Sequence, residues 1–136
     1  MTYNEKKRFL ESYIYSIRKV KGLQNELEEL LTISTGITQK LKPVMVQGGS
    51  NSNKIENGAI KMAELEDKIE QEIERAISRR EDVERVISQI RDTRRREIVE
   101  MRYIHGMSVS RIAHEIEKED TNVYKMLRKS IRSLDI

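Results

Sequence analysis

The chain has 136 residues, of which 36% are charged, 37% hydrophobic and 4% aromatic, and its net charge is +3. It contains no cysteine, which excludes disulfides, thiolate metal sites and cysteine nucleophiles. Bulky core residues are scarce, whereas Glu, Lys, Arg, Ile and Leu are frequent, and this bias favours long amphipathic helices over a sheet-based fold. We therefore expect an all-α protein.

The first predicted helix runs from about Tyr3 to Thr32. Hydrophobic residues recur there at steps of three and four, as on one face of a helix. The stripe consists of Leu10, Ile14, Ile17, Val20 or Lys21, Leu27, and Leu30 or Leu31. It ends before residues 34–53, which contain the single proline, Pro43, and a Gly-Gly-Ser-Asn cluster. We expect this segment to be a long, mobile loop.

A second, longer helix is predicted from the residue after Asn53 to Ile90. At ~1.5 Å per residue it would be ~55 Å long, and a helix with one apolar stripe needs a packed partner. The partner is either the first helix, folded back as a coiled-coil-like hairpin, or the same helix of another subunit. Glu72 and Arg79 would fall near the seam of a strict heptad repeat, which favours a local bundle over a long dimer zipper. We predict that residues 1–91 form a helical hairpin that makes a homodimer or higher oligomer, or binds a partner.

Residues 91–96, with the sequence RDTRRR, are a polar break and the predicted domain boundary. Asp92 or Thr93 is a suitable N-cap for the next helix. Residues 1–90 hold 15 basic and 15 acidic side chains, whereas residues 91–136 hold 11 basic and 8 acidic ones. The whole positive excess therefore lies in the predicted C-terminal domain, residues 92–136, and it suits a polyanion such as DNA.

Three short helices are predicted within residues 92–136. The first carries Ile98, Met101 and Tyr103 or Ile104, and it ends at Gly106, which fits a left-handed C-cap. Ser108 is the predicted N-cap of the second helix, in which Ile112, Ala113 and Ile116 face inward. The third begins near Asp120, with Glu119 and Asp120 as expected capping residues. Its inward positions are Val123, Leu127, Ile131 and Leu134.

This C-terminal segment resembles the fourth conserved region of bacterial sigma factors, a helix-turn-helix that reads a promoter element. The resemblance is carried by Arg102–Tyr103, Gly106, Ser108, Ile112–Ala113, Val123, Leu127 and Leu134. The family often has glycine and an aliphatic residue where Glu117 and Lys118 stand, and Ser or Thr where Glu119 stands. The wider layout, with the segments MRYIHGMSVSRIA and NVYK, is similar to small phage and prophage transcription regulators of Gram-positive bacteria, of the autolysin-regulator and late-gene-activator type.

If the third helix enters the major groove, its outward residues near the N-terminus meet base edges, where Asn can pair with adenine and Lys or Arg with guanine. The expected base contacts are Thr121, Asn122, Tyr124, Lys125 and Arg128.

Phosphate contacts are expected from Lys129 and Arg132 on the third helix, and from Ser108 and Arg111 at the start of the second. Two alternatives remain open. The cations near the end of the third helix could form a solvated face that suits the helix dipole. The run Arg94–Arg96 could contact DNA or polymerase, or only water.

These observations predict sequence-specific binding of double-stranded DNA by a transcription regulator that acts at promoters with RNA polymerase. Two alternatives are the DNA-recognition small subunit of a phage packaging terminase and an adaptor that binds only polymerase. His105 and His114 are the only histidines and no cysteine joins them, so neither a metal site nor a cofactor is expected. No catalytic motif is present, so we expect no enzymatic activity. Neither a membrane span nor a signal peptide is apparent, and the expected location is the cytoplasm.

Overall fold

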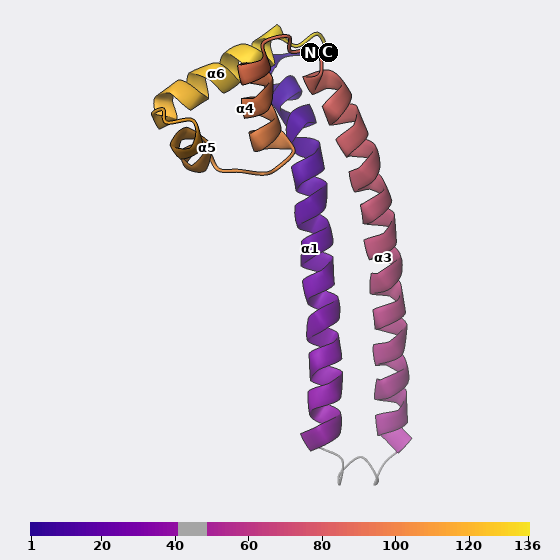
Figure 1. The fold of residues 1–136 in the computed structure, drawn as a ribbon. Coiled ribbons are helices and arrows are strands. Elements are labelled where there is room, and N and C mark those ends of the chain that lie inside the picture. The colour runs from indigo at the N-terminus through magenta and orange to yellow at the C-terminus, as the bar shows by residue number, and fades with distance from the viewer. Residues whose placement is uncertain (41–48) are drawn as a thin grey trace. The chain divides into compact units, whose positions relative to one another are not determined.

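The computed structural model describes the backbone of residues 1–40 and 49–136, and the side chains of residues 1–35 and 56–136. The described residues form five helices and no strand, so the expected all-α class is confirmed. None of these helices has an apolar stretch long enough to cross a membrane. They are α1 (Tyr3–Lys40), α3 (Gly49–Ile87), α4 (Thr93–Tyr103), α5 (Val109–Glu115) and α6 (Asp120–Ser133), as labelled in Figure 1.

The chain divides into two compact units. One, called the core unit here, combines residues 1–17 with residues 75–136, and the other, called the arm, is residues 18–74. This division differs from the predicted boundary between residues 91 and 92. The physical reason is that the beginning of α1 and the end of α3 contribute side chains to the same hydrophobic core as α4, α5 and α6.

Helix α1 begins at a reciprocal capping box. The Thr2 hydroxyl accepts a hydrogen bond from the Glu5 backbone N–H at 3.2 Å, and the Glu5 carboxylate accepts one from the Thr2 backbone N–H at 3.3 Å. Two N–H groups that the first turn of a helix leaves without partners are thereby satisfied. The cap fixes the start of α1 at Tyr3.

The long helices extend into the segment predicted as a loop, residues 34–53. Helix α1 continues to Lys40 and α3 begins at Gly49, so the prediction is wrong at both edges of the segment. Residue propensities and a Gly-Ser-Asn composition are weak priors that helix propagation overrides. Residues 41–48, on which the rest of this prediction falls, lie outside the described residues.

Within the arm, α1 and α3 lie side by side as an antiparallel hairpin (Figure 1). The Lys19 ammonium is 3.6 Å from the carboxylate of Glu72, whose side chain is only 4% exposed. The prediction that the first helix folds back onto the second is confirmed. Glu72 lies at the seam between the two helices, as the heptad pattern indicated. Val20, which follows Lys19, and Ile69, three residues before Glu72, are also buried.

The three predicted C-terminal helices are confirmed as α4, α5 and α6. On α6, each residue predicted to face inward is buried, and on α4 the buried side chains are Ile98, Val99 and Tyr103. Helix α3 ends at Ile87, before the predicted Ile90, because its final carbonyls are satisfied by a tight turn in which the Ile90 N–H bonds to Ile87. The Ile90 side chain is still buried in the core.

Candidate nucleic-acid interface

The segment between α4 and α5 is built around one glycine. Gly106 has a φ of +66°, the left-handed conformation expected from the sequence. Across this turn the Met107 N–H donates to the Met101 carbonyl at 3.0 Å. A Cβ at position 106 would lie 3.4 Å from the Ile14 side chain of α1, so the turn also packs closely against the N-terminal helix.

Ser108, the predicted N-cap of α5, is confirmed, and of the two candidates for the N-cap of α4, Asp92 and Thr93, the cap is Asp92. Asp92 caps α4 by accepting from the Arg95 backbone N–H at 3.0 Å, and Ser108 caps α5 by accepting from the Arg111 N–H at 3.2 Å. These caps stop the chain from continuing one helix into the next. They therefore place Ser108 and Arg111 on the exposed first turn of α5.

The turn between α5 and α6 comprises residues 116–119, and Glu117 adopts a φ of +56° within it. This is the position at which the resembled family often has glycine. The Lys118 N–H donates to the Ala113 carbonyl at 2.9 Å and closes the end of α5. A residue with a Cβ costs about 1–2 kcal/mol in this conformation, so the turn is formed at the expense of local backbone strain.

The N-terminus of α6 differs from the expectation that Glu119 and Asp120 cap it. Glu119 occupies the N-cap position but its side chain makes no capping hydrogen bond. The Asp120 carboxylate accepts a hydrogen bond from the Ser110 hydroxyl at 2.9 Å, and so links the starts of α5 and α6. The Glu119 side chain is one methylene longer than those of Asp and Asn, and longer still than those of Ser and Thr, the residues that suit this position.

Helix α6 has a buried face and an exposed, basic face. Val123, Leu127, Ser130 and Ile131 are buried in the core. Thr121, Lys125, Arg128 and Arg132 follow one another at steps of four, three and four, so they share the opposite face of the helix. Asn122 and Lys129, seven residues apart, run along one edge of this face, and Tyr124, 58% exposed, lies along the other.

Every residue predicted from the sequence to contact DNA is exposed, and lies on α5, at its N-cap or on α6. Arg132, a predicted phosphate ligand, also has a partner within the chain, because its guanidinium lies over the ring of Tyr3 at 5.8 Å. The structure therefore brings Thr121, Lys125 and Arg128 together as a continuous exposed row.

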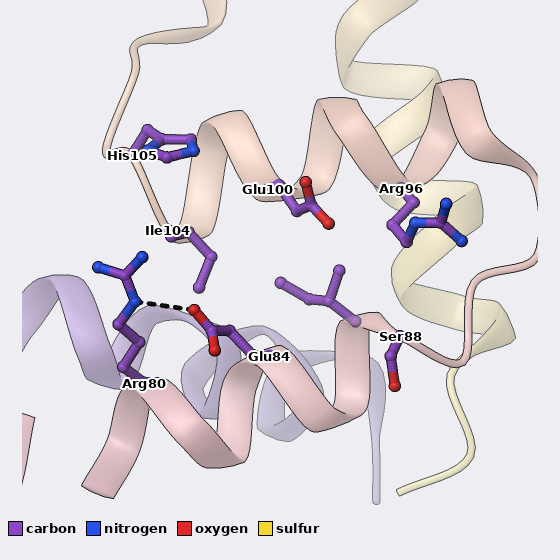
Figure 2. Close-up of a pocket in the computed structure, with 8 residues that line it drawn as sticks. Arg80, Glu84, Ser88, Arg96, Glu100, Ile104 and His105 are labelled. Carbon is purple, nitrogen blue, oxygen red and sulfur yellow. Dashed lines mark hydrogen bonds and ion pairs between the residues drawn. The ribbon is translucent and has the colours of Figure 1, made fainter. Parts of the chain in front are cut away.

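A groove of about 410 Å³ lies within the core unit, between the end of α3 and α4 (Figure 2). Ile87 and Ile104 are its apolar residues, and the charged residues around them have both signs. Arg80 bonds to Glu84 at 2.8 Å and to the Tyr13 hydroxyl at 3.2 Å, and these hydrogen bonds raise the pKa of the Arg80 guanidinium. Arg96 donates to the Ile90 carbonyl at 3.1 Å. Among the described residues, no cluster of His, Asp or Glu is suited to hold a metal ion.

Tyr103, at the end of α4, is 4% exposed and packs in the core of the same unit. Burial raises the pKa of its hydroxyl to about 12, with a smaller contribution from the Glu11 carboxylate on α1. The phenol therefore stays neutral near pH 7 and serves as a core residue.

Sequence reasoning missed the contribution of the N-terminal helix to the core that supports α5 and α6. Leu10 and Tyr13 of α1 belong to the core on which α4 and α6 pack. The Thr2–Glu5 capping pattern was the available signal, because it marks the start of an ordered helix. A single sequence does not show which distant element such a helix packs against.

The fold and the exposed face define an all-α protein in which a helical hairpin is joined to a compact three-helix segment. A protein-family model with the description "Protein of unknown function (DUF1492)" matches residues 34–135. The match spans 102 of the 136 residues, and the chain belongs to this family. Searches of curated proteins and of solved structures give no match.

Proposed function

We propose that this chain is a sequence-specific DNA-binding transcription regulator of the phage type, which acts at promoters together with RNA polymerase. The observation that carries the proposal is the exposed face of α6, where Thr121, Lys125 and Arg128 form a row and Asn122 runs beside it. Amide, ammonium and guanidinium groups on one helix face match the donors and acceptors of base edges in the major groove.

The charge of the core unit supports a polyanionic partner. Residues 1–17 and 75–136 together hold 18 basic and 13 acidic side chains, whereas the arm holds 8 basic and 10 acidic ones. The excess of five positive charges lies in the unit that carries α6. Non-specific attraction to phosphates would bring the helix to DNA, and base contacts would then select the site.

We further propose that the arm joins two or more copies of the chain. One helix-turn-helix module buries little surface on DNA, so useful specificity requires a second module or a polymerase partner. Leu31, Ile33 and Ile60 of the arm are 48%, 53% and 57% exposed, which leaves apolar surface available for association. Light scattering tests this: a dimer agrees with a promoter-binding regulator, whereas a large ring would favour a terminase subunit.

The first experiment is a selection of DNA fragments from random sequence and from the encoding genome at near-physiological salt. Low salt would strengthen non-specific phosphate contacts and mask sequence preference. Recovery of one motif, especially as a repeated half-site beside a promoter, is the expected result. Recovery of no motif, alone and with polymerase present, would contradict the proposal.

The second experiment tests α6 directly with Asn122→Ala and Lys125→Ala. Each variant is expected to lose about 1–3 kcal/mol of discrimination at one base position, because one bidentate contact to a base is removed. Lys61→Ala is the matched control, since Lys61 is an exposed lysine on the arm. Wild-type specificity in both α6 variants, with folding retained, would refute the assignment of α6 as the recognition helix.

A further inference from the structure

The C-terminal end of α6 is held by the first turn of α1. The Lys6 ammonium donates hydrogen bonds to the carbonyl of Leu134 at 2.6 Å and to that of Arg132 at 3.3 Å. Carbonyls at the end of a helix lack partners within the helix and carry partial negative charge. A lysine ammonium satisfies both needs, and the half-buried position of Lys6 orients it toward the protein rather than toward solvent.

Two further contacts act at the same end of α6. The Arg132 guanidinium lies over the ring of Tyr3, which is also in the first turn of α1. The Gln89 side chain, in the turn after α3, bonds to the backbone of Asp135 in both directions: it accepts from the Asp135 N–H at 3.2 Å and donates to the Asp135 carbonyl at 3.5 Å. Residues from two distant parts of the sequence, the first turn of α1 and the turn after α3, therefore hold the end of α6 and the segment that follows it.

We propose that Lys6 is a positioning residue for the recognition helix, an inference that rests on the proposed function. Base readout requires hydrogen bonds of about 2.7–3.2 Å with good angles. Val123, Leu127 and Ile131 hold α6 along its buried face, and Lys6 restricts the remaining movement of its C-terminal end, which would otherwise carry the outer side chains away from these distances. Phosphate contacts tolerate such movement because they depend mainly on charge. Lys6 thus supports discrimination between sequences and contributes little to non-specific affinity.

The capping box at Thr2 and Glu5 sets the position of Lys6 at the start of α1. By fixing the start of α1, it places Lys6 one turn into the helix, where its backbone N–H bonds to the Thr2 carbonyl at 3.0 Å. Farther along α1, Leu10 and Tyr13 are anchored in the core. The lysine therefore projects from a rigid base, which is what a positioning residue requires.

The test compares Lys6→Met with Lys7→Met. Both variants lose one positive charge in the same helical turn, but Lys7 is exposed and lies only 4.0 Å from Glu11 in a surface ion pair. Dissociation constants are measured for the selected site and for a scrambled duplex over a range of salt concentrations. We expect Lys6→Met to weaken binding to the selected site about tenfold, which corresponds to one hydrogen bond to a charged group. Binding of both variants to the scrambled duplex should be equal.

The salt dependence separates positioning from direct contact with DNA. If Lys6 contacted a phosphate, Lys6→Met would lower the salt slope by about one unit relative to Lys7→Met. We expect equal slopes. Lys6→Arg should restore discrimination, because a guanidinium can also donate to both carbonyls. Equal discrimination in Lys6→Met and Lys7→Met, or a reduced slope in Lys6→Met alone, would overturn the positioning role.

Hydrogen exchange distinguishes failure of this inference from failure of the proposed function. In the absence of DNA, the amides of residues 130–134 should exchange about tenfold faster in Lys6→Met than in Lys7→Met, while those of α5 stay unchanged. A wild-type chain without sequence preference would refute the proposed function, and faster exchange would then still support the anchor. Unchanged exchange would overturn the anchor whether or not DNA is bound specifically.

Discussion

The same two long helices run through the core unit and the arm, yet they bury their apolar residues very differently. In the core unit, Leu10, Val83 and Ile87 are at most 1% exposed. In the described part of the arm, the buried hydrophobic residues are Val20 and Ile69, and Leu23, Leu27 and Leu30 are only half-buried. The helical periodicity is similar in both regions, so pattern alone does not explain the contrast.

The difference in burial comes from the number of helices that surround the apolar face of α1 and α3. In the core unit, α4, α5 and α6 share one hydrophobic cluster with the ends of α1 and α3. Among the described residues of the arm, α1 and α3 pack only against each other, and two helices cannot enclose a core from all sides. An amphipathic stripe therefore specifies a helix, whereas the depth of its burial depends on how many other elements surround it.

The largest effect should come from a residue that the sequence placed outside the predicted C-terminal domain, residues 92–136. Leu10 is fully buried, so Leu10→Ala should destabilise the core unit by about 2–5 kcal/mol through lost burial and a cavity. Chemical denaturation followed by circular dichroism measures this change. Leu27→Ala, on the same helix in the arm, is the matched control and should cost less because Leu27 is already half in contact with water. Equal losses in the two variants would contradict the contrast between the regions.

A second prediction uses the ionisation of a buried tyrosine to report on the core unit, because residues 18–74 contain no tyrosine. Burial raises the pKa of Tyr103 to about 12, above the value near 10 of an exposed tyrosine. The folded state therefore holds this proton more tightly, and the stabilisation is fully present below pH 10. It should decline as pH rises from 10 to 12, by about 1.4 kcal/mol at pH 11.

Urea unfolding of the wild type and of Tyr103→Phe over this pH range measures the effect. The phenylalanine variant should lose less stability than the wild type, since the two proteins differ only in the Tyr103 hydroxyl. Parallel stability curves for the two proteins would show that the Tyr103 proton is not linked to folding.

A smaller, stabilising effect is expected from a substitution in the turn between α5 and α6. Glu117 has a φ of +56°, so Glu117→Gly should remove local strain and stabilise the protein by about 1 kcal/mol, less the extra flexibility of glycine in the unfolded chain. Thermal unfolding measures the gain. Glu115→Gly, which introduces glycine into the last turn of α5, is the control and should destabilise. A lower melting temperature for Glu117→Gly would show that its side chain contributes more than the strain costs.

Local signals in the sequence were sufficient to predict much of the structure of residues 92–136. Asp92 and Ser108 at helix starts, Gly106 in the turn, and the inward spacing from Val123 to Leu134 each depend on neighbouring residues alone. Exposure of the candidate DNA-contacting residues follows from the same periodicity. Capping of α6 could not be judged in this way, because the Asp120 carboxylate is engaged by Ser110 of another helix.

The sequence by itself therefore determined the all-α class, the order of the helices, the starts of α4 and α5 and the face of α6 that is exposed, since helix periodicity and capping are short-range properties. Only the tertiary structure decided that α1 completes the core beneath α4 and α6, and that Lys6 holds the end of the last helix. Lys6 and Leu134 are separated by 128 positions. Contacts over such separations arise from packing of complementary surfaces, which the pattern of a single sequence does not encode locally.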